Sequence, residues 1–482
     1  MIFNSFDFAV FFPVFFVLYW FVFQKNLSLQ NILIVAASYL FYGWWDWRFL
    51  GLLTLSSLVD YVVSLELGKR SAPAQRKVLL GVSIVVNLGL LGFFKYYNFF
   101  VESFIDAFTL FGAEFHAQTL NIVLPVGISF YTFQTMSYTI DVYRKELAPT
   151  RSFIDFSAFV AFFPQLVAGP IERASNLLPQ FYTRRTFDVP KAIDGLRQIL
   201  WGFFKKVVIA DNCAEHANFI FNHSEEFSGS TLALGAVYFA FQIYGDFSGY
   251  SDIAIGTSRL LGFELKRNFH FPYFSRDIAE FWRRWHISLS TWFRDYVYLP
   301  LGGSRGSLSQ TVRNVFVIFL ISGFWHGANW TFVAWGALNA LYFLPVLLAK
   351  SHRKHTDGVA EGRILPSIRE LIAMGFTFAL TCIAWIFFRA ENIRHAWDIL
   401  CEIASPSLLT LPRFAGSLKG LVCLALVVFF VGVEWWGRHG NFALERAATL
   451  KYKPVRYGLY YALIGMVFWF VGKEQAFIYF QF

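Results

Sequence analysis

Charged residues are scarce in this chain. Asp, Glu, Lys and Arg make up only 15% of its 482 residues, 56% are hydrophobic, and the mean hydropathy is +0.48. An average soluble domain carries about 25% charged residues, so this composition excludes an ordinary soluble globular protein. The aromatic side chains, which include 60 Phe and 16 Trp, suit a lipid-facing exterior and the interfacial belts of a membrane protein.

Cysteine and the common catalytic motifs are also rare or absent. None of the four cysteines falls in a CxxC or another metal-ligand spacing, so we predict isolated cysteines, no disulfide framework and no bound metal: Cys213, Cys382, Cys401 and Cys423. The chain lacks Walker A, HExxH and GxGxxG motifs. It also lacks an internal repeat, which weakens an inverted-repeat transporter interpretation.

Long apolar runs dominate the chain and predict an all-α polytopic membrane protein, with 1–482 as one integral membrane domain. The first run has no basic segment before it, so we interpret it as a retained span and not as a signal peptide. We expect about eleven to thirteen spans, some of them tilted or re-entrant because several runs are shorter than the ~20 residues of a straight span. The runs are 8–23, 31–42, 49–65, 78–94, 122–140, 153–167, 199–210, 232–243, 315–324, 330–349, 371–388, 421–436 and 457–471.

The net charge of +9 lies in short loops between these runs. Lys and Arg cluster in segments 69–77, 350–354 and 438–456, which is the positive-inside signature of membrane topology. We therefore predict contact with membrane lipid and no nucleic-acid binding. If these loops are cytoplasmic, counting the spans places both the N-terminus and the C-terminal tail, residues 477–482, on the outer side.

Residues 315–349 contain no charged side chain, yet His326 lies near their middle between Trp325 and Gly327. One helix of that length, at ~1.5 Å per residue, would overshoot a bilayer core of ~30 Å. We expect two helical pieces joined near Gly323 and Gly327, because glycine lets the chain break. A titratable ring inside membrane-embedded protein predicts a functional site facing a cavity, and therefore an enzyme or a transporter.

Charged and aromatic residues interleave in segment 266–294. Its large apolar side chains recur at helical spacing, which predicts a helix that lies at the interface or packs within the protein. A membrane-surface helix and a site-forming helix both remain open. His286 follows Trp285 on or beside the apolar stripe, and by itself it is more typical of a structural histidine.

Two further segments carry polar residues in apolar surroundings. Asp246 and Asp252 lie within 242–252, and Gln165 lies within 163–173 beside proline and glycine. Proline makes a regular helix through the second segment impossible. Irregular backbone at membrane depth is tolerated only where protein or a water-filled cavity satisfies it, so these segments predict a lined tunnel.

Together these segments resemble one family, the membrane-bound O-acyltransferases, and in particular the bacterial branch that includes the alginate O-acetylation protein. The resemblance rests on 124–134, 163–173, 244–252, 281–292, 325–327 and the aromatic tail 477–482. It implies a helical ring around a transmembrane tunnel in the bacterial inner membrane. It also implies acetyl transfer from a cytoplasmic thioester, commonly acetyl-CoA, with no bound cofactor. The expected acceptor is an extracytoplasmic polysaccharide such as alginate, reached through a second, extracytoplasmic O-acetyltransferase.

The resemblance also assigns roles to particular residues. His326 corresponds to the catalytic histidine and His286 to a second one. An imidazole with a pKa near 6.5 can take the proton of an attacking hydroxyl, and burial keeps such a ring neutral. Tyr479, the only hydroxyl in the tail, is expected either to relay the acyl group or to belong to a tail that anchors the partner or plugs the tunnel. Candidates for the tunnel lining or a structural role are Gln165, Asp246, Asp252, Arg294, Trp325 and Asn329.

Three alternatives remain open at this point. The branch includes relatives that modify cellulose, peptidoglycan or teichoic acid, so the acceptor is not fixed by the resemblance. A polytopic transporter of a polysaccharide precursor and a non-catalytic assembly subunit are the two interpretations from other functional classes.

Overall fold

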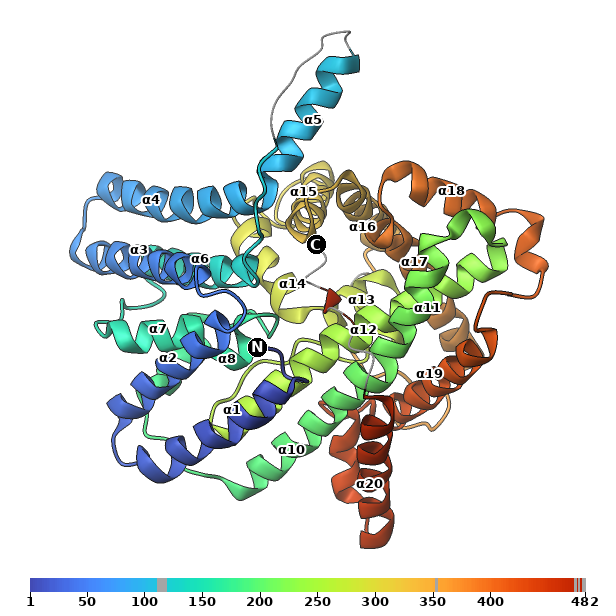
Figure 1. Ribbon diagram of the computed structural model, residues 1–482. Coiled ribbons are helices and arrows are strands. Elements are labelled where there is room, and N and C mark those ends of the chain that lie inside the picture. The colour runs from blue at the N-terminus through green and yellow to red at the C-terminus, as the bar shows by residue number, and fades with distance from the viewer. Residues whose placement is uncertain (111–118, 352–353, 472–474, 476, 479–482) are drawn as a thin grey trace. The chain divides into compact units, whose positions relative to one another are not determined.

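The computed structural model describes residues 1–110, 119–351, 354–471, 475 and 477–478, and it contains no β-strand among them. The contacts of the chain divide it into two compact units (Figure 1). Unit 1 comprises Met1–Ala192 and Thr257–Lys266, and unit 2 comprises Ile193–Gly256 and Arg267–Phe482. The all-helical prediction is confirmed, whereas the prediction of a single domain stays a prediction.

Unit 1 is built from short and medium helices that precede residue 193. They are α1 (Phe6–Val17), η1 (Leu18–Val22), α2 (Leu27–Gly43), α3 (Phe49–Lys69), α4 (Pro73–Leu91), η2 (Gly92–Tyr96), α5 (Tyr97–Leu110), α6 (Ile128–Arg144), α7 (Phe153–Ala161), α8 (Phe163–Leu166) and α9 (Ala174–Phe181). α3, α4 and α6 pack against one another (Figure 1). α10 (Val189–Phe203) and α12 (Gly229–Leu260) each begin in one unit and end in the other.

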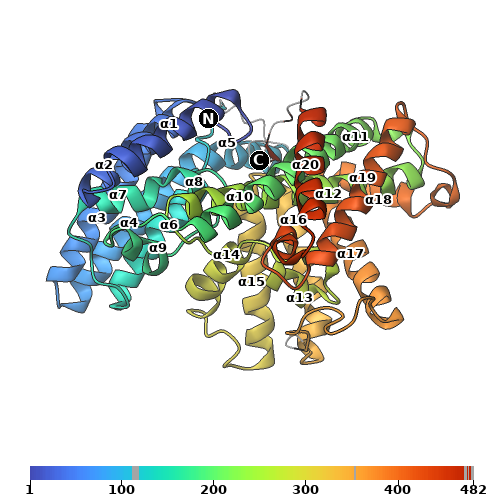
Figure 2. The ribbon, with the colours of Figure 1, turned by 90° about the horizontal axis from the view of Figure 1, so that it is seen from below.

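Unit 2 holds the remaining elements. They are η3 (Phe204–Ala210), α11 (Asp211–Asn222), η4 (Ser224–Glu226), η5 (Pro272–Phe274), α13 (Ile278–Arg284), α14 (Ile287–Phe293), η6 (Arg294–Tyr298), α15 (Leu308–His326), α16 (Trp330–Leu348), α17 (Ile368–Arg389), α18 (Ile393–Ile403), η7 (Pro406–Leu409), α19 (Ser417–Gly437), η8 (Ala443–Thr449) and α20 (Lys453–Phe470). α12 runs alongside α10, η3 and α11 (Figures 1 and 2).

Glycines on α12 explain this close packing. A Cβ on Gly249 would lie 2.8 Å from the carbonyl oxygen of Gly202. A Cβ on Gly245 would lie 2.9 Å from the carbonyl oxygen of Lys205. Both distances are shorter than a van der Waals contact, so α12 meets the α10–η3 segment backbone against backbone.

Six helices in the described part of the chain are long and apolar enough to cross a membrane. They are Phe49–Lys69, Pro73–Thr109, Leu308–His326, Trp330–Leu348, Ile368–Arg389 and Ser417–Gly437. The protein is therefore a multi-pass membrane protein, as predicted. The expected total of eleven to thirteen spans stays a prediction, because the other apolar runs fall on helices that are shorter, broken or more polar.

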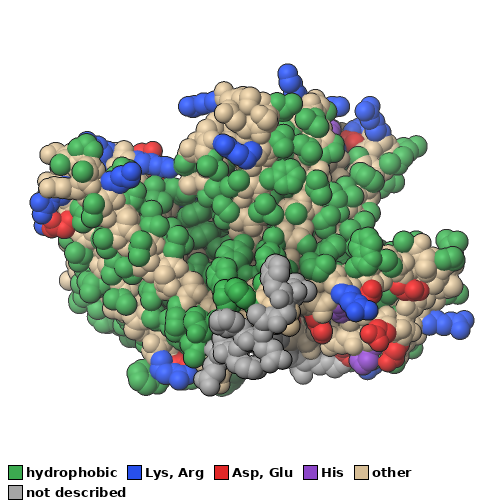
Figure 3. Space-filling view, turned by 90° about the horizontal axis from the view of Figure 1, so that it is seen from above, with side chains coloured by type: hydrophobic (Ala, Val, Ile, Leu, Met, Phe, Trp, Pro, Cys, Tyr) green, Lys and Arg blue, Asp and Glu red, His purple; other side chains and the backbone are tan. Residues whose placement is uncertain are grey.

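The surface agrees with burial in lipid. Large apolar side chains such as Phe376 on α17, Leu421 on α19 and Trp469 on α20 are exposed. On the face shown in Figure 3, hydrophobic side chains form the largest share of the coloured surface, and Lys and Arg gather mainly toward its margins. A soluble protein rarely exposes so much contiguous apolar area.

Two boundaries differ from the sequence prediction. The run 122–140 becomes helical only at Ile128, because Gly127 before it adopts a left-handed conformation with φ 76°. The run 78–94 continues through η2 and α5 into one helix, Pro73–Thr109. The irregular backbone predicted within 163–173 is confirmed, since residues 167–173 are not helical.

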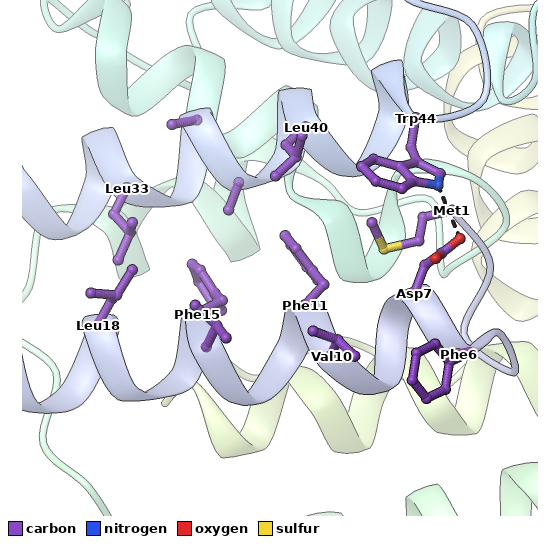
Figure 4. A pocket seen from close by; sticks show the side chains of 13 residues that line it. Met1, Phe6, Asp7, Val10, Phe11, Phe15, Leu18, Leu33, Leu40 and Trp44 are labelled. Carbon is purple, nitrogen blue, oxygen red and sulfur yellow. Dashed lines mark hydrogen bonds between the residues drawn. The ribbon is translucent and has the colours of Figure 1, made fainter.

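An apolar groove of about 580 Å³ runs between α1 and α2 in unit 1 (Figure 4). Phe11, Phe15 and Leu40 line it, and at one end the Trp44 indole donates a hydrogen bond to Asp7 Oδ2 over 3.0 Å. Apolar lining of this kind suits a lipid-facing position. The groove holds no residue of the histidine site, which belongs to unit 2.

Candidate active site

His326 lies at the C-terminal end of α15, where the chain turns back into α16. Gly327 is extended, and Asn329 caps α16 by accepting a hydrogen bond from the Thr331 amide over 3.0 Å. Residue 327 must be glycine for steric reasons, because a Cβ there would lie 2.0 Å from the ring of Phe332. The prediction of two helical pieces joined at a break beside His326 is confirmed.

Glycine also sets how closely α15 and α16 pack. A Cβ on Gly323 would lie 2.2 Å from the carbonyl oxygen of Phe332, and a Cβ on Gly336 would lie 2.4 Å from that of Phe319. The two backbones therefore touch just before the break. This contact fixes the end of α15 and with it the position of His326.

Gly323→Ala is expected to destabilise the folded protein by roughly 1–3 kcal/mol, because the added methyl group must push the two helices apart. Gly375 on α17 has open space around its Cβ position, so Gly375→Ala serves as the matched control. That change should be neutral or slightly stabilising, since alanine favours a helix. Thermal unfolding of the purified variants in detergent measures both. Equal melting temperatures for the two variants would contradict the close helix contact.

Aromatic rings surround His326 on several sides. The ring centroids of Trp325, Trp335 and Phe388 lie 4.9, 5.1 and 5.3 Å from that of His326, each with an edge-to-face orientation. These rings come from α15, α16 and α17, and they leave the His326 residue 6% exposed. A site of this kind excludes bulk water, which strengthens electrostatic interactions inside it.

His286 occupies a second break, which was not predicted. The single helix predicted from the apolar stripe 281–293 is wrong, because α13 ends at Arg284 and α14 begins at Ile287. His286 between them adopts a left-handed conformation with φ 43°. The segment packs within the protein, since both Trp285 and His286 are buried. This burial favours the site-forming alternative over a membrane-surface helix, and the site-forming role itself stays a prediction.

Asn268 fixes the orientation and the tautomer of His286. The Asn268 side-chain oxygen accepts hydrogen bonds from the amide and the hydroxyl of Ser288, over 3.2 and 2.9 Å. Because an amide N–H can only donate, the atom that faces it must be the oxygen. His286 Nδ1 lies 3.1 Å from the same oxygen and therefore carries the proton. The lone pair of the neutral ring is then on Nε2.

The structure brings the two histidines into one neighbourhood. The Trp325 ring centroid lies 4.9 Å from that of His326 and 6.2 Å from that of His286. Burial lowers the pKa of His286 well below its usual value, and His326 lowers it further. His286 is therefore neutral at physiological pH, which is the state that can accept a proton.

The two predicted carboxylates on α12 are paired with consecutive lysines of η3. Lys205 Nζ lies 2.5 Å from Asp252 Oδ2, and Lys206 Nζ lies 2.8 Å from Asp246 Oδ1. All four side chains are buried. The opposite charge of the partner offsets the free-energy cost of burying each of these groups away from water.

Comparison with known proteins identifies the protein family. The family model described as "MBOAT, membrane-bound O-acyltransferase family" matches residues 39–376. The chain belongs to the membrane-bound O-acyltransferase family. This membership resolves the choice between enzyme and transporter, so the protein is a membrane-bound O-acyltransferase.

Three relatives show how far the similarity extends. The "Probable alginate O-acetylase AlgI" of Azotobacter vinelandii is 42% identical over 442 residues, which are 91% of this chain and 85% of the relative. The protein of the same description from Pseudomonas aeruginosa is 43% identical over 445 residues, 91% of this chain and 81% of the relative. The "Peptidoglycan O-acetyltransferase" of Helicobacter pylori is 36% identical over 430 residues, 83% of this chain and 79% of the relative.

The other predicted site residues of this acyltransferase have diverse surroundings. The Trp325 ring lies near both histidines, and the Asn329 amide donates to the carbonyl oxygen of Glu391 over 2.8 Å. Arg294 is exposed and pairs with Asp295. Gln165 belongs to unit 1, where its amide bonds the carbonyl oxygen of Phe159 over 3.0 Å. Tyr479 lies outside the described residues. The catalytic and tunnel-lining roles stay predictions.

Several site residues of the acyltransferase escaped the sequence analysis. Lys205, Lys206 and Glu434 interrupt apolar runs, and such interruptions are a usable signal for functional or paired charges. The hydroxyl of Tyr244 donates to Glu434 Oε2 over 2.5 Å, and the Trp201 indole donates to Glu434 Oε1 over 3.2 Å. Trp335 and Phe388 beside His326 carried no such signal, because one more aromatic residue is unremarkable in this composition.

Proposed function

We propose that this acyltransferase moves an acetyl group from acetyl-CoA on the cytoplasmic side of the bacterial inner membrane to the outer side, for O-acetylation of a polysaccharide such as alginate. The relatives from Azotobacter vinelandii and Pseudomonas aeruginosa, described as probable alginate O-acetylases, support this acceptor. The observation that carries the proposal is the pair of buried histidines, His286 and His326, whose rings both lie near that of Trp325 in a chain of this family.

The chemistry assigned to His326 is general base catalysis. Its imidazole takes the proton of the acceptor hydroxyl while the oxygen attacks the carbonyl carbon of the thioester. The new C–O bond forms, the C–S bond breaks, and the proton passes from the imidazole to the departing thiolate. His286 stays neutral beside this site, with its orientation fixed by Asn268.

Positive side chains support a site for the phosphates of the donor. Burial and, to a smaller extent, the positive charges of Arg267 and Arg284 lower the pKa of His270 to about 3. His270 also interacts with His439 and with the backbone of Gly440, which belong to the basic segment predicted to be cytoplasmic. Phosphate groups of acetyl-CoA would be attracted to this concentration of positive charge.

Another envelope polymer is the alternative acceptor, since the Helicobacter pylori relative is described as a peptidoglycan O-acetyltransferase. Complementation separates the two acceptors. The gene is expressed in alginate-producing cells that lack their own homologue, and the ester-linked acetyl content of alginate and of peptidoglycan is measured. Restored acetylation of alginate supports the proposal, and restored acetylation of peptidoglycan alone contradicts it.

We further propose that both termini lie on the outer side and that the tail acts with an extracytoplasmic O-acetyltransferase. Two roles stay open for Tyr479, acyl relay and partner docking. Activation by an adjacent base would make its phenol a nucleophile. Tyr479→Phe keeps the ring and removes only the oxygen, so the relay predicts that polymer acetylation is lost. Acetylation at the wild-type level in this variant would eliminate the relay and leave docking.

A further inference from the structure

The chain folds back on itself just before its end. In unit 2, Phe477 is 6% exposed and Ile478 is fully buried. The ring of Phe477 lies 5.2 Å from that of Tyr250 on α12. The amide of Ile478 donates a hydrogen bond to Asp246 Oδ2 over 2.7 Å. The described tail residues therefore occupy a defined position against α12.

Lys206 also contacts the tail segment, through the backbone of Gln475. Its ammonium group lies 2.8 Å from Asp246 Oδ1, 2.9 Å from Asp211 Oδ1 and 3.3 Å from the carbonyl oxygen of Gln475. The ammonium donates hydrogen bonds to Asp211 Oδ1 and to the Gln475 carbonyl oxygen, and it forms an ion pair with Asp246 Oδ1. Two carboxylates around one ammonium leave an excess of negative charge, which favours the additional amide hydrogen from Ile478.

The hydrogen bonds that join Asp246 and Lys206 to the tail are made to backbone atoms of the tail. Asp246 accepts from the amide of Ile478, and Lys206 donates to the carbonyl of Gln475. Such contacts fix the path of the chain whatever the side chains are.

The neighbouring ion pair provides an internal comparison. Lys205 and Asp252 join the same two elements, η3 and α12, over 2.5 Å. The second oxygen of Asp252 accepts from the Gln198 amide over 2.8 Å, so its partners lie on the α10–η3 segment. The Lys205–Asp252 pair therefore joins the α10–η3 segment to α12 only. The Lys206–Asp246 pair joins the same two elements and also contacts the tail.

We propose that Lys206 and Asp246 form a receptor for the C-terminal tail of this same chain and act as positioning residues for acetyl delivery. This inference rests on the proposed function, in which the tail acts on the outer side. Loss of the receptor releases Gln475, Phe477 and Ile478 from unit 2, and acetyl delivery by the tail falls. The chemistry at His326 does not require the receptor.

Thiol labelling of the full-length purified protein tests the receptor without relying on activity. Cys401 is exposed and the other three cysteines are buried, so Cys401→Ser gives a suitable background. Ile478→Cys then places one thiol at a fully buried tail position and keeps the backbone amide. Its rate of reaction with a maleimide reports release of the tail.

Asp246→Ala is expected to raise this labelling rate about tenfold, because a charge-assisted hydrogen bond is lost. Asp246→Asn keeps an acceptor oxygen and should give an intermediate rate. Asp252→Ala, the matched control, should leave the rate unchanged. An unchanged rate in Asp246→Ala, or an equal rise in Asp252→Ala, would overturn the receptor.

Two further readouts separate release of the tail from other failures. Labelling of buried Cys213, Cys382 and Cys423 must stay slow, and if it rises with that of the tail, general unfolding replaces the receptor as the explanation. Polymer acetylation measured in Asp246→Ala with residue 478 native should fall. Faster labelling with unchanged acetylation would overturn the positioning role, while the proposed acetyl transfer would stand.

Discussion

Polymer acetylation is expected to fall by ~10²–10⁴-fold when His326 is replaced by alanine, while the protein is still made and inserted into the membrane. The reason is that no attacking hydroxyl can lose its proton to a methyl group. The ring lies at the end of α15 among Trp325, Trp335 and Phe388. The measurement is the ester-linked acetyl content of the polymer from cells that carry each variant.

A third buried histidine supplies the control. His216 on α11 is 6% exposed, as His326 is, and its ring packs against those of Tyr238 and Phe414. His216→Ala removes an equally buried imidazole and should leave most of the acetylation. Unchanged acetyl content in stably expressed His326→Ala would refute the catalytic assignment, and an equal loss in both variants would point to folding.

Replacing His286 is expected to have the next largest effect, a loss of about tenfold. That corresponds to removing one supporting interaction of about 1.4 kcal/mol. Asparagine is the better substitute, because the left-handed conformation at φ 43° is tolerated by Asn and strained for Ala. His286→Ala should therefore combine the chemical loss with reduced stability, and comparison of the two variants separates these effects.

The pH dependence of the reaction distinguishes support from catalysis. Burial and His326 lower the pKa of His286 well below its usual value, so His286 is neutral throughout pH 6.5–8 and adds no inflection there. The ratio of wild-type to His286→Asn rates in isolated membranes should be constant over this range. A ratio that changes with pH, or a loss as complete as that in His326→Ala, would make His286 a catalytic partner.

The break at His326 could be predicted because its causes are local. An uncharged run too long for one span, interrupted by Gly323, His326 and Gly327, leaves few structural solutions. The break at His286 could not be predicted, because apolar periodicity continues through it from Phe281 to Leu289. A left-handed histidine leaves no mark in such a pattern.

The tertiary contacts between polar side chains could not be predicted from the sequence either. Asn268 lies 18 residues before His286, and Lys206 pairs with an aspartate 40 residues later. Nothing in the spacing of these residues indicates which of several polar groups will meet. The sequence could mark Asp246 as an unusual charge in an apolar segment. Only the structure shows that its partners are Lys206 and the amide of Ile478.

The most direct test of the central claim is acetyl transfer by the purified protein reconstituted in lipid. Radiolabelled acetyl-CoA is supplied with the polymer and the partner transferase, and labelled ester on the polymer is counted alongside released CoA. The account predicts transfer and CoA release by the wild-type protein and by His216→Ala, and neither above background by His326→Ala. Equal transfer by wild-type protein and His326→Ala would contradict it.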